Sequence, residues 1–228
     1  MSVAYLTMPA SSCIVYTSVF FQDFAHMKSE FENNLKSYSN HYEIRYDLFR
    51  DRSMKNLKNT LQYLNSHEID YIFTFRSSDK NKIELMYSTA MEYAPPVIDV
   101  DMGSFVFEND FFKGSRLMIS FHGKNDDDVP TILNHMSRLK PDIYKVALSY
   151  TDTGKFLSDL HFVYLYKKQN NIKIAYIPMG TGNSFLRVVS AYIVSDYSYA
   201  SYGQPTAPGQ ISSDQFNSVL GMFKEKYE

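Results

Sequence analysis

The chain has little of what several large classes of protein require. Its 228 residues include one cysteine, Cys13, and no tryptophan. A single cysteine excludes an internal disulfide framework and fits a reducing compartment. No stretch approaches the roughly 18 apolar residues that a transmembrane helix needs, and no basic region precedes a long apolar run at the amino terminus. We therefore expect an intracellular, cytoplasmic protein with no membrane partner.

Charge and metal-ligand patterns are equally sparse. The net charge is only −2, which gives no reason to expect nucleic acid as a partner. The six histidines and the cysteine have no spacing typical of metal ligands, so we expect no metal. We assign no role to five of the histidines, which are His26, His41, His67, His135 and His161.

The sequence does contain a regular alternation of short β-branched or aromatic runs with longer amphipathic segments. The runs predict strands at Val3–Met8, Tyr42–Phe49, Ile69–Arg76, Val97–Met102, Leu117–His122, Ile143–Tyr150, Ile172–Met179 and Tyr197–Tyr202. The segments between them predict helices at Val19–Tyr38, Ser53–Asn65, Lys80–Tyr93, Asp127–Leu139, Thr153–Lys168, Asn183–Val194 and Ser213–Lys226, with a short turn near Asn109–Lys113. This order favours an α/β fold, a closed parallel (β/α)₈ TIM barrel in which residues 1–228 form a single domain. A doubly wound open sheet is the alternative, but no glycine-rich dinucleotide motif follows the first strand.

Several predicted strands carry polar residues at alternate positions, which places those residues on one face. The residues are Glu43, Arg45, Asp47, Arg76, Asp99, Asp101, Ser120 and His122. If the apolar faces pack on the helices, the polar faces point into the barrel, where charges near the carboxyl ends of strands form the site in this fold. Simpler roles stay open. Asp47 and Asp101 could pair with structural arginines, Glu43 and Arg45 could form one buried ion pair, and His122 could be a core histidine.

One predicted strand, Ile143–Tyr150, is an apolar run interrupted by a single lysine. Alternation places Ile143, Lys145 and Ala147 on the same face. A lysine buried without a partner is costly and tends to lose its proton, and a neutral amine is the nucleophile that forms imines with ketones. An edge strand with a solvated lysine is the alternative reading of this run.

Short segments along the chain resemble those of the type I 3-dehydroquinate dehydratases, in the same order as in that family. They are residues 43–47 (EIRYD), 73–76 (FTFR), 98–101 (IDVD), 119–122 (ISFH), 144–147 (YKVA), 178–180 (PMG) with Arg187, and 206–211 (TAPGQI). The last segment is the most specific single match. Together the segments extend from the second predicted strand to the last helix.

The resemblance implies a barrel that removes water from 3-dehydroquinate to give 3-dehydroshikimate, in the shikimate route to aromatic compounds. Lys145 would form a Schiff base (an imine) with the ring ketone, and His122 would act as general base and then as general acid. No cofactor is implied, because the lysine itself supplies the electron sink.

The resemblance also implies six residues that bind the substrate, which are Glu43, Arg45, Arg76, Arg187, Thr206 and Gln210. The planar fork of Arg187 would bind the substrate carboxylate, with further hydrogen bonds from Thr206 and Gln210. The other three would hold ring hydroxyls, and Arg45 would also favour the neutral form of the lysine by like-charge repulsion.

The chain departs from the family pattern after Arg76. The family carries a glutamate followed by two glycines there, which form a mobile flap, whereas this chain reads SSDKN over residues 77–81. The resemblance therefore leaves open which acid orients the histidine, and Asp79 is a candidate. Leu186 and Thr206 stand where serine is common, and the aromatic-rich fourth βα unit is short.

Two other functions stay open. One is a degenerate barrel that binds a shikimate-like ligand without turnover, and the other is a different imine-forming lyase, such as an aldolase. Members of the family often form dimers, which makes a homodimer the assembly to test.

Overall fold

The computed structural model describes residues 13–104, 107–180 and 182–224 of the chain. The strands are β1 (Ile14–Val19), β2 (His41–Arg45), β3 (Asp70–Thr74), β4 (Val97–Asp101), β5 (Arg116–Lys124), β6 (Ile143–Ser149), β7 (Lys173–Met179) and β8 (Tyr197–Ser201). The helices are α1 (Phe24–Asn33), α2 (Met54–Ser66), α3 (Lys80–Met91), α4 (Val129–Arg138), α5 (Thr153–Asn170), α6 (Ser184–Ile193) and α7 (Ser213–Lys224). Within these ranges no helix is both long and apolar enough to cross a membrane.

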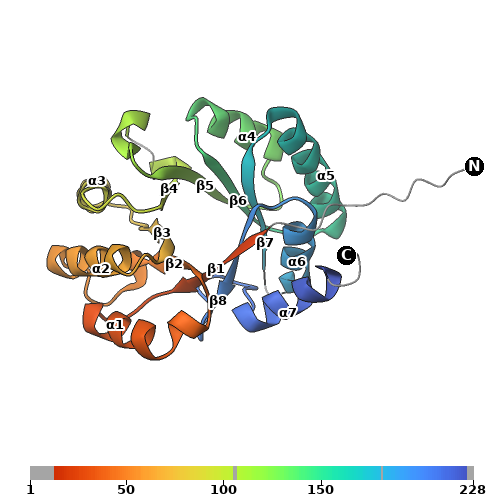
Figure 1. Cartoon of the computed structure of the whole chain (residues 1–228). Coiled ribbons are helices and arrows are strands. Elements are labelled where there is room, and N and C mark those ends of the chain that lie inside the picture. Colours follow the sequence, from red (N-terminus) through yellow and green to blue (C-terminus); the bar gives the residue numbers. More distant parts are fainter. Residues whose placement is uncertain (1–12, 105–106, 181, 225–228) are drawn as a thin grey trace, which may run out of the picture.

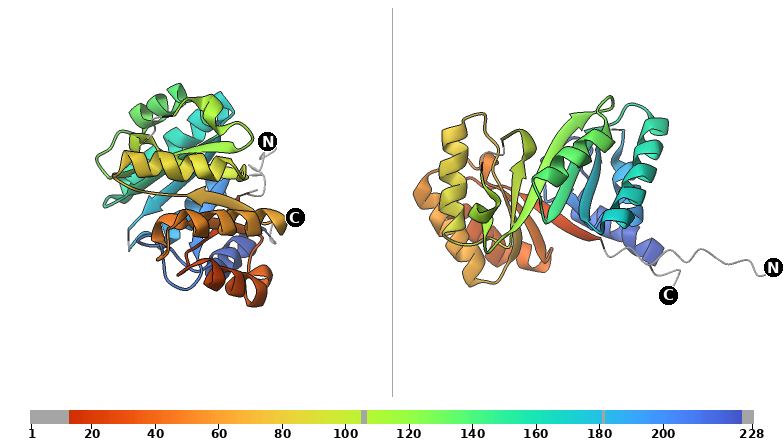
Figure 2. Two further views of the ribbon diagram at one scale, coloured as in Figure 1. Left: turned by 90° about the vertical axis from the view of Figure 1, so that its left-hand side faces the viewer. Right: turned by 90° about the horizontal axis from the view of Figure 1, so that it is seen from above.

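The strands form one parallel sheet that curves into a nearly closed barrel. Their order is β7-β6-β5-β4-β3-β2-β1-β8, so strands that are consecutive in the chain from β1 to β7 are neighbours in the sheet, and β8 pairs with β1. The helices form an outer ring around the strands (Figure 1), and two further views show them covering the outer face of the sheet (Figure 2). The (β/α)₈ barrel predicted from the sequence is confirmed.

A seam between β7 and β8 remains where, in the described chain, no strand ladder forms. One backbone hydrogen bond crosses it, from Asp196 N to Ile174 O at 2.7 Å. Side chains satisfy other backbone groups of β7: Asp196 Oδ2 accepts from Ile174 N at 2.9 Å, and Ser195 Oγ accepts from Tyr176 N at 3.0 Å. Ser190, on α6, donates to Tyr176 O. Buried polar backbone groups need such partners, so these side chains replace the missing ladder.

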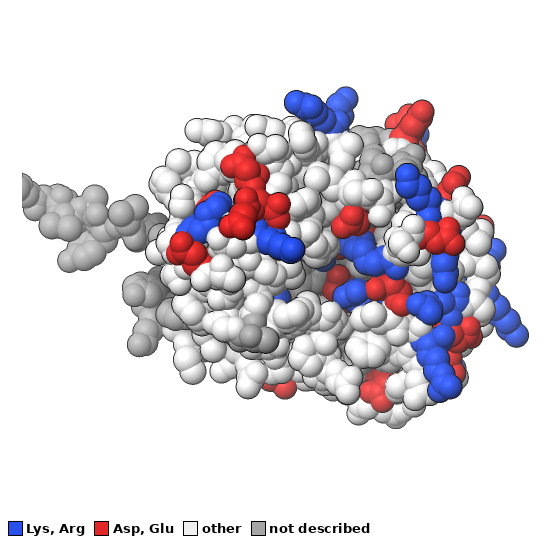
Figure 3. Space-filling view, turned by 180° about the vertical axis from the view of Figure 1, so that it is seen from behind, with Lys and Arg blue, Asp and Glu red and all other residues white. Residues whose placement is uncertain are grey.

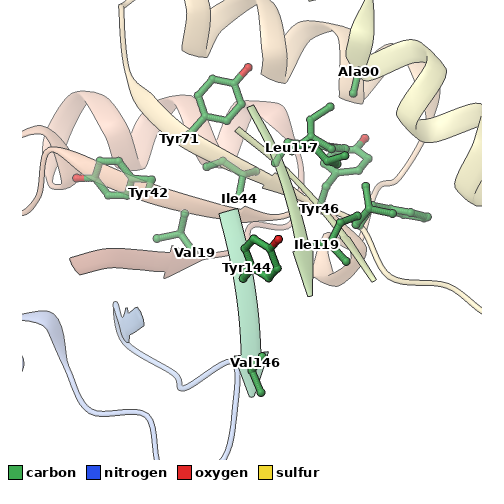
Figure 4. Packing of buried hydrophobic residues seen from close by; sticks show 14 of the residues in the cluster. Val19, Tyr42, Ile44, Tyr46, Tyr71, Ala90, Leu117, Ile119, Tyr144 and Val146 are labelled. Carbon is green, nitrogen blue, oxygen red and sulfur yellow. The ribbon is translucent and has the colours of Figure 1, made fainter. Parts of the chain in front are cut away.

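Strand alternation divides the apolar side chains into two cores. On β6, Tyr144 and Val146 belong to the large outer core between sheet and helices, part of which Figure 4 shows. Ile143 and Ala147 belong to an inner core that fills the barrel. Lys145 lies between these two inward positions on a strand that pairs with β5 and β7, and it is only 6% exposed. The alternative of a solvated lysine on an edge strand is therefore wrong.

Several predicted boundaries differ from the structure. The predicted strand Val3–Met8 lies outside the described residues, and the first strand found is Ile14–Val19. Helix α1 is shorter than the predicted Val19–Tyr38 because the side chain of Asp23 caps its amino end by accepting from His26 N at 2.8 Å. The second strand ends at Arg45, where a 3₁₀ turn begins, so the prediction that Asp47 shares its inward face is wrong.

The fourth βα unit is short, as predicted. A 3₁₀ turn at Asn109–Phe112 stands between β4 and β5, at the upper left of Figure 1. Stacked rings of Phe107 and Phe111, with centroids 4.5 Å apart, take part in covering this side of the barrel.

Candidate active site

The predicted site residues all line one cavity of about 380 Å³. They are Glu43, Arg45, Arg76, His122, Lys145, Arg187, Thr206 and Gln210. Arg45 and His122 lie near the carboxyl ends of β2 and β5, and Glu43 and Lys145 lie deeper in β2 and β6. The other four residues belong to segments that follow strands. Parallel barrels carry their sites at this end of the strands. On the face seen in Figure 3, acidic and basic side chains stand beside each other next to a hollow and form no patch of one sign.

Lys145 lies at the floor of this cavity with two carboxylates around its ammonium group. Its Nζ donates to Asp99 Oδ2 at 2.8 Å and to Glu43 Oε1 at 3.2 Å, and it lies 3.9 Å from the centroid of the Tyr199 ring. The aromatic face attracts a cation, and the carboxylates balance its charge. The lysine is thus buried with partners, and the case of a lysine buried without one does not apply.

The carboxylate of Asp99 joins Lys145 to Arg76. Asp99 is fully buried, and its Oδ1 forms an ion pair with Arg76 Nη2 at 2.7 Å. Arg76 Nη2 also donates a hydrogen bond to Ser120 Oγ at 2.7 Å. Burial alone would raise the pKa of Asp99, but Arg76 and then Lys145 hold it well below its ordinary value. Arg76 therefore holds Asp99 and Ser120 in place at the floor of the cavity.

Glu43 and Arg45 do not form the single ion pair that the sequence left open. Glu43 instead accepts hydrogen bonds from Ser18 at 2.6 Å, from Thr74 at 3.1 Å and from Lys145. Burial would raise the pKa of Glu43, but Lys145 and then Arg45 lower it. Arg45 makes a bidentate contact with Asp47, at 3.0 and 2.7 Å.

The charged contacts of Lys145 are therefore carboxylates, and the charged contact of Arg45 is its own partner, Asp47. Like-charge repulsion between Arg45 and the lysine stays a prediction. The simpler role considered for Asp47, pairing with an arginine, is the one that the structure shows.

His122 reaches the cavity from β5, the strand beside β6. It aligns with Ala147 across the β5–β6 ladder, two residues beyond the pair Ser120 and Lys145. Its Nδ1 lies 3.4 Å from Asp101 Oδ2. Asp79, the other candidate for orienting the histidine, caps α3 instead, accepting from Asn81 N at 3.0 Å.

Arg187 is the most deeply buried cation of the cavity, at 2% exposure. Its Nη2 donates to Pro208 O at 3.0 Å, and its buried Nε has no hydrogen-bond partner in the described part of the chain. Burial lowers the pKa of Arg187 to about 10, so the guanidinium is still charged at neutral pH. Among the described residues no carboxylate lies within ion-pair distance of it. A ligand carboxylate entering the cavity would supply the missing partner.

The segment from Thr206 to Gln210 closes one side of the cavity. Gln210 Oε1 accepts from Thr206 N at 2.8 Å and from its hydroxyl at 2.9 Å, while Nε2 donates to Ser18 Oγ and Ala200 O, both at 3.0 Å. The hydrogen bonds of Gln210 are thus used within the chain. Gly209 allows the turn, because its φ is +75° and a Cβ there would lie 2.1 Å from Gly180 O.

Three residues of the site were not singled out by the sequence as parts of it. Ser18 and Thr74 bond to Glu43, and the ring of Tyr199 lies under the lysine. Asp99 was expected on the inward face of its strand, but its pairing with Lys145 was not predicted. In the described ranges, no group of three or more His, Cys, Asp or Glu residues has the arrangement of metal ligands.

Comparison with known proteins identifies the family. Residues 15–227 match the family described as Type I 3-dehydroquinase. The chain belongs to the type I 3-dehydroquinase family. It is similar to the 3-dehydroquinate dehydratase of Thermoplasma volcanium, at 36% identity over 97% of this chain and 94% of that protein. The corresponding protein of Thermoplasma acidophilum is 33% identical over 89% of this chain and 87% of that one.

A solved structure supports the same backbone fold. The crystal structure of 3-dehydroquinate dehydratase from Geobacillus kaustophilus superposes with a TM-score of 0.83, over 97% of this chain and 93% of that one, at 20% identity. Identity at this level supports the fold and leaves the chemistry to the residues of the cavity.

Proposed function

We propose that this protein is a 3-dehydroquinate dehydratase that removes water from 3-dehydroquinate, to give 3-dehydroshikimate, through an imine on Lys145. The observation that carries the proposal is that one cavity holds a buried lysine, a histidine and a buried arginine for which the described residues supply no carboxylate partner. The substrate offers a ketone to the first, an acidic C–H to the second and a carboxylate to the third. Membership of the type I 3-dehydroquinase family supports the same reaction.

The first step forms the imine. Lys145 gives a proton to a neighbouring acceptor; Asp99 Oδ2 and Glu43 Oε1 lie within hydrogen-bond distance. The neutral amine then adds to the ring ketone to give a carbinolamine. The acceptor returns the proton to the hydroxyl of this carbinolamine, which leaves as water and gives a protonated imine. The positive charge stays at the same nitrogen, so both carboxylates and the ring of Tyr199 stabilise the intermediate as they stabilise the free ammonium.

The second step removes the hydroxyl group. His122 takes a proton from the carbon next to the protonated imine, and the electron pair forms an enamine. The enamine expels the hydroxyl from the next carbon, and His122 returns its proton to that hydroxyl, which leaves as water. Hydrolysis of the conjugated imine then releases the product and regenerates the amine, so the net loss is one water molecule.

Arg187 would bind the carboxylate of the substrate, because its fork is buried in the wall of the cavity and directs one bond to the backbone of the closing loop. Glu43, Arg45 and Arg76 would face the ring hydroxyls. Thr206 and Gln210 would support binding chiefly by holding the closing loop, since they bond to each other.

Borohydride reduction in the presence of 3-dehydroquinate tests the proposal. Hydride converts the imine to a stable secondary amine, so mass spectrometry of the digested protein is expected to find the adduct on Lys145. Lys145→Ala should give no adduct and no rise in the ultraviolet absorbance of the conjugated product. Lys173→Ala, which removes a lysine whose side chain is 62% exposed on β7, is the control and should give both. Wild-type protein that yields neither adduct nor conjugated product would overturn the proposal.

The same proposal includes a place in the shikimate route to aromatic amino acids, a cytoplasmic location, and one catalytic domain over residues 1–228. A homodimer stays a prediction from the family, and light scattering on the purified protein would test it.

A further inference from the structure

Asp101 lies at the carboxyl end of β4, where its two carboxylate oxygens have different partners. Oδ1 accepts a hydrogen bond from Gly103 N at 3.0 Å, and Oδ2 lies 3.4 Å from His122 Nδ1. The backbone contact fixes the carboxylate, so its second oxygen is held toward the imidazole. Hydrogen bonds of catalytic histidines are often long in the absence of substrate and shorten in the complex.

The spacing on β4 gives each reacting group its own acid. Asp99 and Asp101 are two residues apart and therefore on the same inward face. The first contacts Lys145, and the second contacts His122. Burial would raise the pKa of Asp101, but the hydrogen bond with His122 and then the charge of Arg76 lower it, so the carboxylate is ionised at neutral pH.

Asp79 does not compete for this role. Its side chain accepts from two backbone N–H groups, of Asn81 at 3.0 Å and Lys82 at 3.3 Å, as the N-cap of α3. Asp99 is likewise committed, to Lys145 and Arg76. Among the described residues, Asp101 is the carboxylate that the structure pairs with His122.

We propose that Asp101 is a positioning residue that holds the His122 ring with its hydrogen on Nδ1 and leaves the lone pair of Nε2 for the cavity. A carboxylate accepts only, so a neutral imidazole beside it must present N–H, and the opposite nitrogen is then the base. The consequence for turnover rests on the proposed dehydratase function, whereas the tautomer itself can be measured without substrate.

The first test is the tautomer of His122 in the ligand-free protein. Two-dimensional ¹⁵N–¹H spectra of the imidazole groups, recorded at about pH 8.5 where an ordinary histidine is neutral, distinguish the two tautomers. His122→Gln identifies the signals of His122. We expect Nδ1–H in the wild-type protein and in Asp79→Asn, in which asparagine can still cap the helix.

Asp101→Asn is expected to reverse the tautomer. Asparagine keeps an oxygen for Gly103 N–H but can turn an amide N–H toward His122, which favours an unprotonated Nδ1 and a hydrogen on Nε2. The signals of the other five histidines show whether the variant is folded. An unchanged His122 tautomer in folded Asp101→Asn, or Nε2–H in the wild-type protein, would overturn the proposal.

Kinetics give a second, separate readout. In Asp101→Asn we expect kcat to fall roughly 10- to 100-fold with KM within about twofold, because a wrongly oriented base affects the elimination and not binding. Borohydride should still trap the adduct, and Asp101→Glu should recover part of kcat. A purely structural role would change KM and adduct formation together, and equal kcat in wild type and Asp101→Asn would contradict the proposal. If the wild-type protein has no activity at all, the proposed function fails while the tautomer result still decides the role of Asp101.

Discussion

The buried charges at the floor of the cavity allow a quantitative prediction of how much stability the protein loses when Asp99 is replaced. Asp99→Asn keeps the size of the side chain but removes the negative charge that lies 2.8 Å from Lys145 Nζ and 2.7 Å from Arg76 Nη2. Glu43 remains as a partner for the lysine, whereas Arg76 loses its ion pair. Removing one partner of a buried ion pair lowers the free energy of unfolding by about 3–5 kcal/mol. Because Lys145 keeps Glu43 as a partner, we expect a loss near the lower end of this range, about 3 kcal/mol. For a chain of this length, this corresponds to a fall in Tm of about 6–12 °C.

The effect should also depend on pH, with a definite sign. The pKa of Asp99 lies well below its ordinary value of 3.8, so its stabilisation is complete above that value and is lost as the pH falls below it. Urea unfolding at neutral pH should therefore separate wild type from Asp99→Asn, and the two curves should converge as the pH is lowered below about 4.

Asp70→Asn is the matched control, because the Asp70 carboxylate also has two partners, His41 and Tyr16, but is 35% exposed. The free energy of unfolding of Asp70→Asn should be less than about 1 kcal/mol below that of the wild type. A loss in Asp99→Asn as small as that of the control, or a difference from wild type that grows in acid, would refute the reasoning. The double variant with Lys145→Met should be less destabilised than the sum of its parts, because contacting charges are coupled.

Three further predictions concern the cavity. His122→Ala should still form the imine but stall before elimination, so borohydride traps an adduct while no conjugated product accumulates; full turnover would remove His122 from the mechanism. Arg187→Ala should raise KM roughly 10- to 100-fold with little change in kcat, because a carboxylate contact is made in ground and transition states alike, and steady-state kinetics at several substrate concentrations measure both. Gly209→Ala should destabilise the closing loop and raise KM, because its Cβ would lie 2.1 Å from a backbone oxygen. The control Gly221→Ala, in α7 with open space around its Cβ, should raise stability by about 0.5–1 kcal/mol and leave KM unchanged.

Much of the fold was predictable because strand and helix periods differ and the chain alternates between them. The predicted strands from β2 to β8 overlap the observed ones, since each carries β-branched, aromatic or other apolar residues at alternate positions in a short segment between polar turns. The first strand was missed because Ile14–Val19 places Thr17 and Ser18 among its apolar residues, both buried where they bond to other parts of the chain. The end of β2 was missed because Tyr46 and Leu48, in the 3₁₀ turn that follows the strand, continue the alternation of apolar and polar residues that is typical of a strand.

The members of the candidate site could be named from the resemblance, but their partners could not. Sequence spacing gives the face on which Lys145 lies and not the carboxylates opposite it, because Glu43 comes from a strand 102 residues earlier and Asp99 from one 46 residues earlier. In the same way, Arg45 and Asp47 were assigned to one face of a strand, whereas the turn after Arg45 lets them pair. Contacts of this kind depend on register and on turns, which local patterns do not specify.

The seam between β7 and β8 means that the two ends of the proposed substrate are supported in different ways. Lys145 and its acids belong to strands joined by continuous ladders, whereas Arg187 lies on α6, one turn before Ser190, whose hydroxyl bonds to the seam at Tyr176 O. A molecule bound to both Lys145 and Arg187 would therefore connect the strands of the continuous sheet to α6, which contacts the seam. Such binding would stabilise the seam, so hydrogen exchange should slow most for the backbone amides beside it.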